Sequence, residues 1–306
     1  MRKLVLAAFL FVSTISTNSL ADIKMGIILG FTGPIESLTP AMANSAELAF
    51  NEASNSGKLL GGKKISVERA DSTCVDSAAA TTAAEGLISN GVVAIMGADC
   101  SGVTGAIATN VAVPNGVVMI SPSATSPGLT DLNDNGYFFR TAPSDARGGQ
   151  ILADITKDRK IKSVAITYTN NDYGKGLADV YKAAVEGHGI KVTAVAAHED
   201  GKADYSAEVA TLASAGGDAV AVIGYIDQGG KGIIQASLDS GAFNVFILSD
   251  GMIGDSLTDN FGKALNKSFG SLPGSTGKGA GVFADVAKAA GIDSSGPYTG
   301  ESYDAA

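Results

Sequence analysis

The stretch Ile23-Lys24-Met25-Gly26-Ile27-Ile28-Leu29 is a short apolar run of strand length, and it decides the reading of everything that follows it. A break comes at Gly33-Pro34, and residues 40–55 then carry apolar side chains at helical spacing. This order predicts a strand, a loop and a helix.

The same unit recurs along the chain. In the first half we predict strands over residues 65–70, 92–96 and 117–120, with helices over 76–89 and 103–111. In the second half we predict helices over 145–157, 173–186, 205–214 and 231–240, and strands over 163–168, 190–197, 219–223 and 245–248. Strands that alternate with helices in this way indicate parallel sheets covered by helices.

About eight such cycles exceed what one compact domain holds, so the fold class is α/β with two doubly wound parallel-sheet domains joined by a hinge. The first break falls near residues 140–144 and the second at residues 270–281, which are rich in Gly, Ser, Pro and Lys without an apolar period. We therefore expect an N-terminal lobe over 22–140, a C-terminal lobe over 141–272 and a crossover back to the first lobe over 273–306.

The N-terminus has the features of an export signal. Arg2 and Lys3 precede an apolar run over residues 4–12, and Ser19-Leu20-Ala21 fits the small-x-small pattern cut by signal peptidase. The alternative is a membrane anchor, but the run is about half the ~20 residues that a membrane span needs. We expect residues 1–21 to be a cleaved signal peptide, with no Cys in it to carry a lipid.

The composition argues against several function classes. The net charge is −9, with 22 Lys and Arg against 31 Asp and Glu, so a basic field that could neutralise a nucleic acid is missing. Only two His and two Cys occur, which leaves little room for a metal site or a Ser-His-Asp hydrolase. We expect a binding protein that needs no cofactor or metal and has no nucleic-acid partner.

Cys74 and Cys100 are the only thiols, and export into an oxidising compartment favours a disulfide between them. The alternative is two buried free thiols.

Ligands of open parallel sheets bind beyond the carboxyl ends of the strands. In the first half these segments are rich in hydroxyls, as in residues 97–102 and 121–127, which suits a carboxylate. In the second half, residues 171–174, 224–227 and 249–251 carry aromatic and acidic side chains, which suit an ammonium and an apolar stem. Taken singly, each of these positions is better explained as a helix cap or a turn, because capping is so common.

Together these segments resemble a known family. Phe31-Thr32-Gly33-Pro34, Cys74 with Cys100-Ser101, residues 122–127 and Tyr173-Gly174-Lys175-Gly176-Leu177 are similar to the leucine/isoleucine/valine-binding proteins of ABC importers. The resemblance covers nearly all of the chain after residue 21 and implies a type I periplasmic binding protein fold. Residues 301–306 by themselves indicate the beginning of a helix with Ser302 as its cap, and the alternative is a short disordered tail. Residues 302–306 also resemble the start of a helix that the family continues, so we expect a truncated sequence.

The resemblance implies a ligand site. Ser101 and Thr125 would hold the ligand carboxylate, while the Ser123 carbonyl and Asp250 would receive the ammonium. Tyr173 and Tyr225 would close over the ligand from the second lobe. Asp250 stands where the family more often has Glu.

The side-chain preference of the site is less defined. Leu38, Phe31 and Tyr298 suit an aliphatic amino acid, whereas Glu36 and Asp99 could serve a polar or cationic one, Asp99 being more typical of a helix cap. We favour an aliphatic or branched-chain amino acid, carried by a monomer in the periplasm and passed to a membrane ABC permease.

Two rival functions remain. A sensor ectodomain of the same fold would need a transmembrane helix. A secreted α/β hydrolase would need a nucleophile motif, and the chain contains no Gly-x-Ser-x-Gly elbow and no phosphate loop. His188 is expected at a solvated helix end and His198 on the surface, so we predict no enzymatic activity.

Overall fold

The computed structural model describes residues 22–274 and 278–306, so the predicted signal peptide lies outside the described residues. The first sheet has five parallel strands in the order β2-β1-β3-β4-β5. Its strands are β1 (Ile23–Leu29), β2 (Ile65–Asp71), β3 (Ala94–Gly97), β4 (Val118–Ser121) and β5 (Phe138–Arg140).

The second sheet also has five parallel strands, in the order β10-β9-β8-β6-β7. Its strands are β6 (Ser163–Thr169), β7 (Lys191–His198), β8 (Ala219–Ile223), β9 (Phe246–Leu248) and β10 (Phe269–Gly270). All five residues of β8 are apolar and buried, as expected for an inner strand covered by helices on both faces. The predicted fold class is confirmed.

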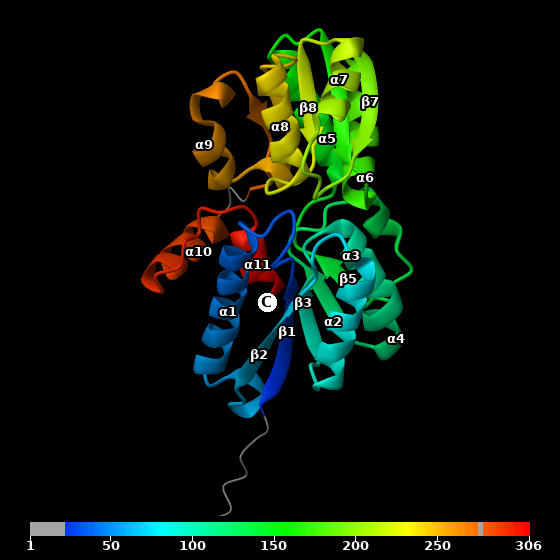
Figure 1. Ribbon diagram of the computed structural model, residues 1–306. Coiled ribbons are helices and arrows are strands. Elements are labelled where there is room, and N and C mark those ends of the chain that lie inside the picture. Colours follow the sequence, from blue (N-terminus) through cyan, green and yellow to red (C-terminus); the bar gives the residue numbers. More distant parts are fainter. Residues whose placement is uncertain (1–21, 275–277) are drawn as a thin grey trace, which may run out of the picture.

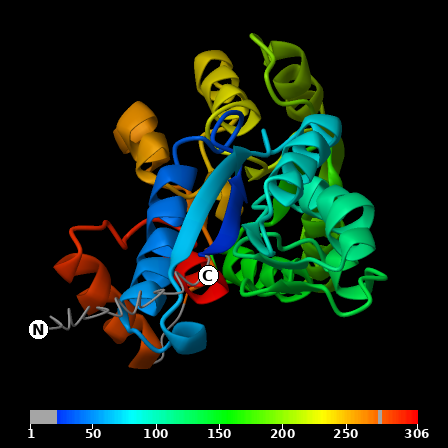
Figure 2. The ribbon, with the colours of Figure 1, turned by 90° about the horizontal axis from the view of Figure 1, so that it is seen from below.

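Helices cover both sheets, and each sheet with its helices forms a separate lobe (Figure 1). The helices of the first lobe are α1 (Thr39–Asn55), α2 (Ser77–Ser89), α3 (Ser101–Ile107), α4 (Val113–Asn115), α10 (Lys278–Ala289) and α11 (Thr299–Ala305). Those packed with the second sheet are α5 (Asp145–Asp158), α6 (Asp172–Gly187), α7 (Ser206–Ala215), α8 (Gly229–Ser240) and α9 (Asp255–Phe261). Viewed from below, α1, α10 and α11 lie on one side of the first sheet, and α2 to α4 lie on the other (Figure 2).

Local sequence explains where several helices begin. The Asp76 carboxylate accepts hydrogen bonds from the backbone N–H groups of Ala78 and Ala79 and so caps α2. Asn171 caps α6 in the same way by accepting from the Gly174 N–H. Each cap lies in a loop that follows the carboxyl end of a strand, β2 for α2 and β6 for α6. Because the strands are parallel, such loops lie at one edge of each sheet, the carboxyl edge.

The structure differs from the sequence-based elements in the shortest pieces and at the C-terminal end. β5 and β10 are three and two residues long and were not predicted, and neither was α9. The segment expected to connect the lobes already forms helix from Lys278. Ser302 lies inside α11, whose cap position is Tyr298, so the predicted Ser302 cap is wrong.

The chain passes from the first lobe to the second after β5 and returns after β10. β5 ends at Arg140 in the first sheet, and α5 begins at Asp145 against the second. After β10 the chain returns to the first lobe, where α11 packs along α1. The Thr141 hydroxyl donates a hydrogen bond to the Glu301 carbonyl at 2.8 Å, so the two crossing segments lie together.

Cys74 and Cys100 form the predicted disulfide, with Cα atoms 5.2 Å apart. The bond joins the loop after β2 to the residue before α3. Both half-cystines are buried. The disulfide therefore fixes two of the loops at the carboxyl edge of the first sheet.

Reduction of this disulfide is expected to lower the free energy of unfolding by about 3 kcal/mol, because it closes a loop with a sequence separation of 26 residues. Denaturant unfolding with and without reductant measures the change. The double variant Cys74→Ser/Cys100→Ser should be as unstable as the reduced protein and should not respond to reductant. Two reactive thiols in the unreduced, unfolded chain would contradict the assignment.

Candidate functional site

A small cavity of about 30 Å³ lies between the lobes, at the carboxyl ends of both sheets. It is lined by Ile35, Leu38, Met42, Asp99, Cys100, Ser101, Ser123 and Tyr298 from the first lobe and by Tyr173, Tyr225, Asp250 and Gly251 from the second. Five of the six residues predicted for the ligand therefore meet at one place.

The first lobe contributes hydroxyl groups. Ser101 is the first residue of α3 and is buried, and its hydroxyl accepts a hydrogen bond from the Ser126 N–H at 3.1 Å. Ser123 is half-buried and donates its hydroxyl proton to the Asp99 carbonyl at 3.2 Å. The Ser101 hydroxyl proton is thus still available for an acceptor.

Thr125 behaves differently from the other predicted residues. It is buried, and among the described residues its hydroxyl has no hydrogen-bond partner. It does not line the cavity itself, although its carbonyl accepts the Asp145 N–H at 2.9 Å. The structure thus places Thr125 behind the cavity wall, next to the start of α5.

Asp250 is the buried acidic residue that the second lobe contributes to the cavity lining. It directly follows Ser249 after β9 and is only 7% exposed. Its Oδ1 accepts a hydrogen bond from the Tyr173 hydroxyl at 2.7 Å, and its Oδ2 accepts one from the Tyr298 hydroxyl at 2.5 Å. Within the described parts of the chain no lysine or arginine forms an ion pair with Asp250.

Two tyrosines form the wall beside Asp250. Tyr173 and Tyr225 stack with ring centroids 5.2 Å apart and an interplanar angle of 18°. The Tyr225 hydroxyl accepts a hydrogen bond from the Asn171 side-chain amide at 3.4 Å. Both rings are buried, so the wall is apolar on its faces and polar at its hydroxyl ends.

The electrostatics of the site are acidic. Burial raises the pKa of Asp250 and of Asp99, and the pKa of Asp145 is raised well above its ordinary value by burial and by the charge of Asp250. Arg140, whose positive charge acts on Asp145, donates its guanidinium hydrogens to the carbonyls of Ala124 and Ser126. An excess of buried carboxyl groups favours a ligand with a positive charge.

Direct contacts hold the lobes together around the cavity. The Asp227 carboxylate in the second lobe accepts the Ser37 N–H at 2.8 Å, and the Asp227 N–H donates to the Pro34 carbonyl at 2.9 Å. On the other side, the Ser126 hydroxyl donates to the Asp172 carbonyl at 3.1 Å. With Tyr298 and Asp250, these contacts describe a closed arrangement of the lobes.

Some predicted lining residues lie elsewhere. Phe31 is outside the cavity, with the Arg69 guanidinium carbon 5.6 Å from its ring centroid, and Glu36 is exposed. Asp99 lines the cavity but does not cap α3, because its carboxylate accepts the N–H groups of Gly30 and Cys100.

Ile35, Met42 and Asp145 were not predicted. Ile35 and Met42 line the cavity, and Asp145 is a buried carboxyl group whose Oδ2 has no partner among the described residues. The apolar spacing at the start of α1 could have indicated Met42, which lies one helical turn beyond Leu38. Asp145 gives no such signal, since an acidic residue in the first turn of a helix is common.

The prediction that His198 lies on the surface is wrong. His198 ends β7 and is 1% exposed, with its Nδ1 2.8 Å from the Thr167 hydroxyl and its ring edge-on to Tyr205. Burial lowers its pKa from 6.5 to about 4. His188, in contrast, is the C-terminal cap residue of α6, and its Nε2 lies 2.8 Å from Asp154.

Stability is expected to fall by about 3 kcal/mol as the pH drops from about 6.5 to about 4 because of His198 alone. Over this range the unfolded chain binds a proton at His198 that the folded chain excludes, so acid favours unfolding. Denaturant unfolding of the wild type and of His198→Gln between pH 4 and 7 gives the free energy of unfolding as a function of pH for each protein. The difference between the two curves is the contribution of His198.

The comparison with a variant is needed because burial also raises the pKa of carboxyl groups such as Asp99. These groups increase the free energy of unfolding as the pH falls, opposite to the effect of His198. They are present in both proteins and cancel to first order. Parallel curves for His198→Gln would contradict the assignment of a neutral, buried imidazole.

In residues 22–274 and 278–306, no helix is long and apolar enough to cross a bilayer. The same residues contain no cluster of three or more His, Cys, Asp or Glu side chains arranged to hold a metal ion.

Comparison with known proteins decides the family. A family model described as periplasmic binding protein matches residues 22–302. The chain belongs to the periplasmic binding protein family. The resemblance drawn from the sequence motifs is thereby confirmed at the level of the family.

Individual periplasmic binding proteins resemble the chain at moderate identity. It is 32% identical over 228 residues to Leu/Ile/Val-binding protein homolog 3 of Brucella melitensis, covering 74% of this chain and 61% of that protein. It is 28% identical over 279 residues to an amino acid binding protein of Pseudomonas aeruginosa, covering 89% and 74%. The chain thus spans about three fifths of the length of the Brucella relative.

Solved structures of this family share the fold. The branched-chain amino acid transporter substrate binding protein LivJ of Streptococcus pneumoniae, solved with isoleucine, superposes with a TM-score of 0.78 at 26% identity, over 93% of this chain and 81% of that one. The leucine binding protein LivK of Thermotoga maritima superposes with a TM-score of 0.79 at 23% identity, over 92% and 80%.

Proposed function

We propose that this periplasmic binding protein captures a free amino acid between its two lobes and delivers it to an ABC-type importer. The observation that carries the proposal is the buried Asp250 carboxylate, which faces the hydroxyl groups of the first lobe across the cavity and pairs with no cation of the described chain. A zwitterion supplies the ammonium that Asp250 lacks and the carboxylate that the hydroxyl groups can bind.

The roles of the residues follow from this arrangement. Ser101 and Thr125 hold the ligand carboxylate, Asp250 and the Ser123 carbonyl receive the ammonium, and Tyr173 and Tyr225 cover the ligand. Thr125 does not line the cavity, so its hydroxyl reaches the ligand only after a small rearrangement of the cavity wall. An aliphatic or branched-chain side chain is favoured because Ile35, Leu38 and Met42 line the remaining wall.

Entry of the ligand requires the lobes to separate. The cavity of about 30 Å³ is far smaller than the several hundred Å³ that small-molecule pockets usually enclose. The contacts of Asp227 with the first lobe and of Tyr298 with Asp250 must therefore break or rearrange when an amino acid enters. Closure around the ligand is a hinge motion between two rigid lobes.

The wider assignments belong to the same proposal. Residues 1–21 direct export to the periplasm, and the lobes span 22–140 and 141–272, with 273–306 returning to the first lobe. The protein acts as a monomer and without catalysis. The names of its relatives as Leu/Ile/Val-binding and amino acid binding proteins support this reading.

A thermal-shift screen tests the proposal. The protein, freed of bound ligand by unfolding and refolding, is heated with each common amino acid in turn. A ligand at one hundred times its Kd stabilises the folded state by about 2.7 kcal/mol, which raises Tm by several degrees. We expect this shift with aliphatic amino acids. A refolded protein with a native Tm that responds to no amino acid would overturn the proposal.

A further inference from the structure

The loop that carries Tyr225 rests on a partly buried acidic residue that no predicted role covers. Asp200 lies in the loop after β7, and its Oδ1 accepts the N–H of Gly229, the first residue of α8, at 3.0 Å. Its Oδ2 accepts a hydrogen bond from the hydroxyl of Thr169, the last residue of β6. Asp200 thus joins the ends of β6 and β7 to the start of α8.

The Tyr225 loop, residues 224–229, closely approaches His198 at both ends and Asp200 at its second end. A Cβ atom on Gly229 would lie 2.6 Å from Asp200 Oδ1 and 2.8 Å from His198 Cδ2, and one on Gly224 would lie 3.1 Å from His198 Nε2. Glycine at these two positions lets the backbone of residues 224–229 settle onto His198 and Asp200. The backbone of the Tyr225 loop therefore packs directly against the side chains of His198 and Asp200.

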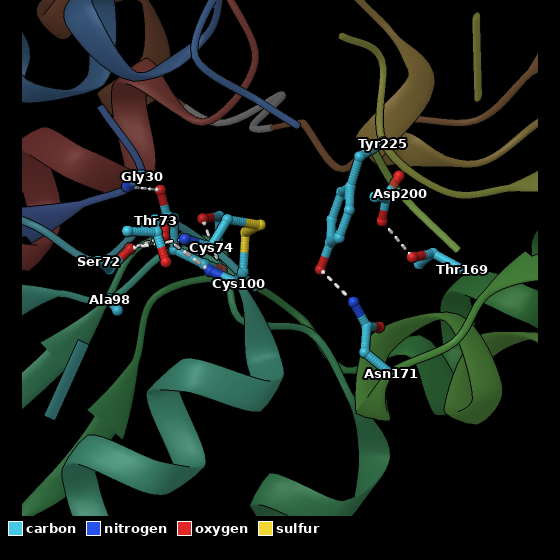
Figure 3. Close-up of a disulfide and its surroundings, with 12 residues drawn as sticks. Gly30, Ser72, Thr73, Cys74, Ala98, Cys100, Thr169, Asn171, Asp200 and Tyr225 are labelled. Carbon is cyan, nitrogen blue, oxygen red and sulfur yellow. Dashed lines mark hydrogen bonds between the residues drawn. A yellow bond between two sulfur atoms is a disulfide. The ribbon is translucent and has the colours of Figure 1, made fainter. Parts of the chain in front are cut away.

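Asp200 also acts on the hydroxyl end of Tyr225. The Thr169 carbonyl accepts the Asn171 N–H at 2.8 Å, and the Asn171 side chain donates to the Tyr225 hydroxyl at 3.4 Å. Figure 3 shows Asp200 hydrogen-bonded to Thr169 beside Tyr225, with the Asn171 side chain at the hydroxyl end of the Tyr225 ring. One carboxylate thus supports the backbone of Tyr225 through Gly229 and its hydroxyl through Thr169 and Asn171.

We propose that Asp200 is a positioning residue that holds Tyr225 in its stacked place over the ligand. The inference rests on the proposed function, because it assumes that Tyr225 covers a bound amino acid. Asp200 lines no part of the cavity and acts only through the Tyr225 loop. Its effect on affinity comes from preorganisation of that loop.

Titration calorimetry with L-leucine measures the effect. Asp200→Ala should weaken binding about ten- to a hundredfold, since the loop is then ordered only when the ligand binds. Asp200→Asn keeps an oxygen for the Gly229 N–H and should stay within about threefold of the wild type. Unchanged affinity in Asp200→Ala would overturn the inference.

Asp218→Ala is the matched control. Asp218 Oδ2 accepts the N–H groups of Lys162 at 2.8 Å and Ser163 at 2.9 Å at the opposite end of the same sheet. The variant Asp218→Ala loses comparable backbone hydrogen bonds far from Tyr225, so its affinity for L-leucine should stay within about twofold of the wild type. A loss as large as that of Asp200→Ala would show a general effect of lobe stability and would overturn the inference.

A second measurement needs no ligand. The chain contains eight Tyr and no Trp, so its near-ultraviolet circular dichroism reports on the tyrosines. Asp200→Ala should change the tyrosine band in the presence of Tyr225 and leave it nearly unchanged in a Tyr225→Phe background. An equal change in both backgrounds would overturn the role of Asp200. If the wild type binds no amino acid, the proposed function fails while this measurement still decides the role of Asp200.

Discussion

Replacing Asp250 with alanine is expected to weaken the binding of L-leucine at least a hundredfold. The carboxylate is buried and held by the hydroxyls of Tyr173 and Tyr298, so in the proposed site it would offer its negative charge to the ligand ammonium. Removing one partner of a buried, hydrogen-bonded charge pair costs about 2–5 kcal/mol. Titration calorimetry on the ligand-free protein measures the loss directly.

Two further variants separate charge from packing. Asp250→Asn keeps the shape and one acceptor oxygen but not the charge, so it should also bind poorly. Asp255→Ala removes an exposed carboxylate five residues away that does not line the cavity, and it should bind like the wild type. Nearly unchanged affinity in both Asp250 variants would contradict the role given to this residue.

The long elements of the fold could be predicted because their apolar spacing is unambiguous. The predicted strands at residues 23–29 and 219–223 coincide with β1 and β8, which lie inside their sheets and are apolar almost throughout. β5 and β10 lie at sheet edges and are too short for any period to show. Such strands are defined by pairing with a neighbour, which sequence spacing does not encode.

His198 shows how neighbouring charges mislead. Glu199 and Asp200 follow it, and three polar residues at a strand end normally indicate solvent. In the structure, Thr167 and Tyr205 flank the imidazole, and the backbone at Gly224 and Gly229 approaches it closely. These partners come from distant parts of the chain, so burial of His198 follows only from the tertiary fold.

The candidate site was predictable in its position and partly in its members. Ligands meet parallel sheets at the carboxyl ends of the strands, and the loops there bring Ser101, Ser123 and Asp250 to one cavity. Tyr298 reaches the same cavity from the returning segment, and its hydroxyl supports Asp250. That contact crosses the lobes and could be found only in three dimensions.

A ligand that lacks either charged end is expected to bind at least a thousandfold more weakly than the free amino acid. L-leucine amide has lost the carboxylate that the Ser101 and Thr125 hydroxyls would bind, and N-acetyl-L-leucine has lost the ammonium that Asp250 would bind. In each complex a buried polar group of the protein is left without a partner. Sites built to hydrogen-bond a ligand group reject analogues that lack it by large factors.

Competition against bound L-leucine, followed by calorimetry, measures both analogues on the same protein. The two losses are expected to respond differently to the Asp250 variants, because in the proposed site only the ammonium end would contact that residue. In Asp250→Asn, L-leucine should lose most of its advantage over N-acetyl-L-leucine, while its advantage over the amide should persist. If the amide and the N-acetyl derivative bind the wild type as well as free leucine does, the ligand is not held by its two charged ends. Asp250 would then face some other cationic or hydrogen-bonding group.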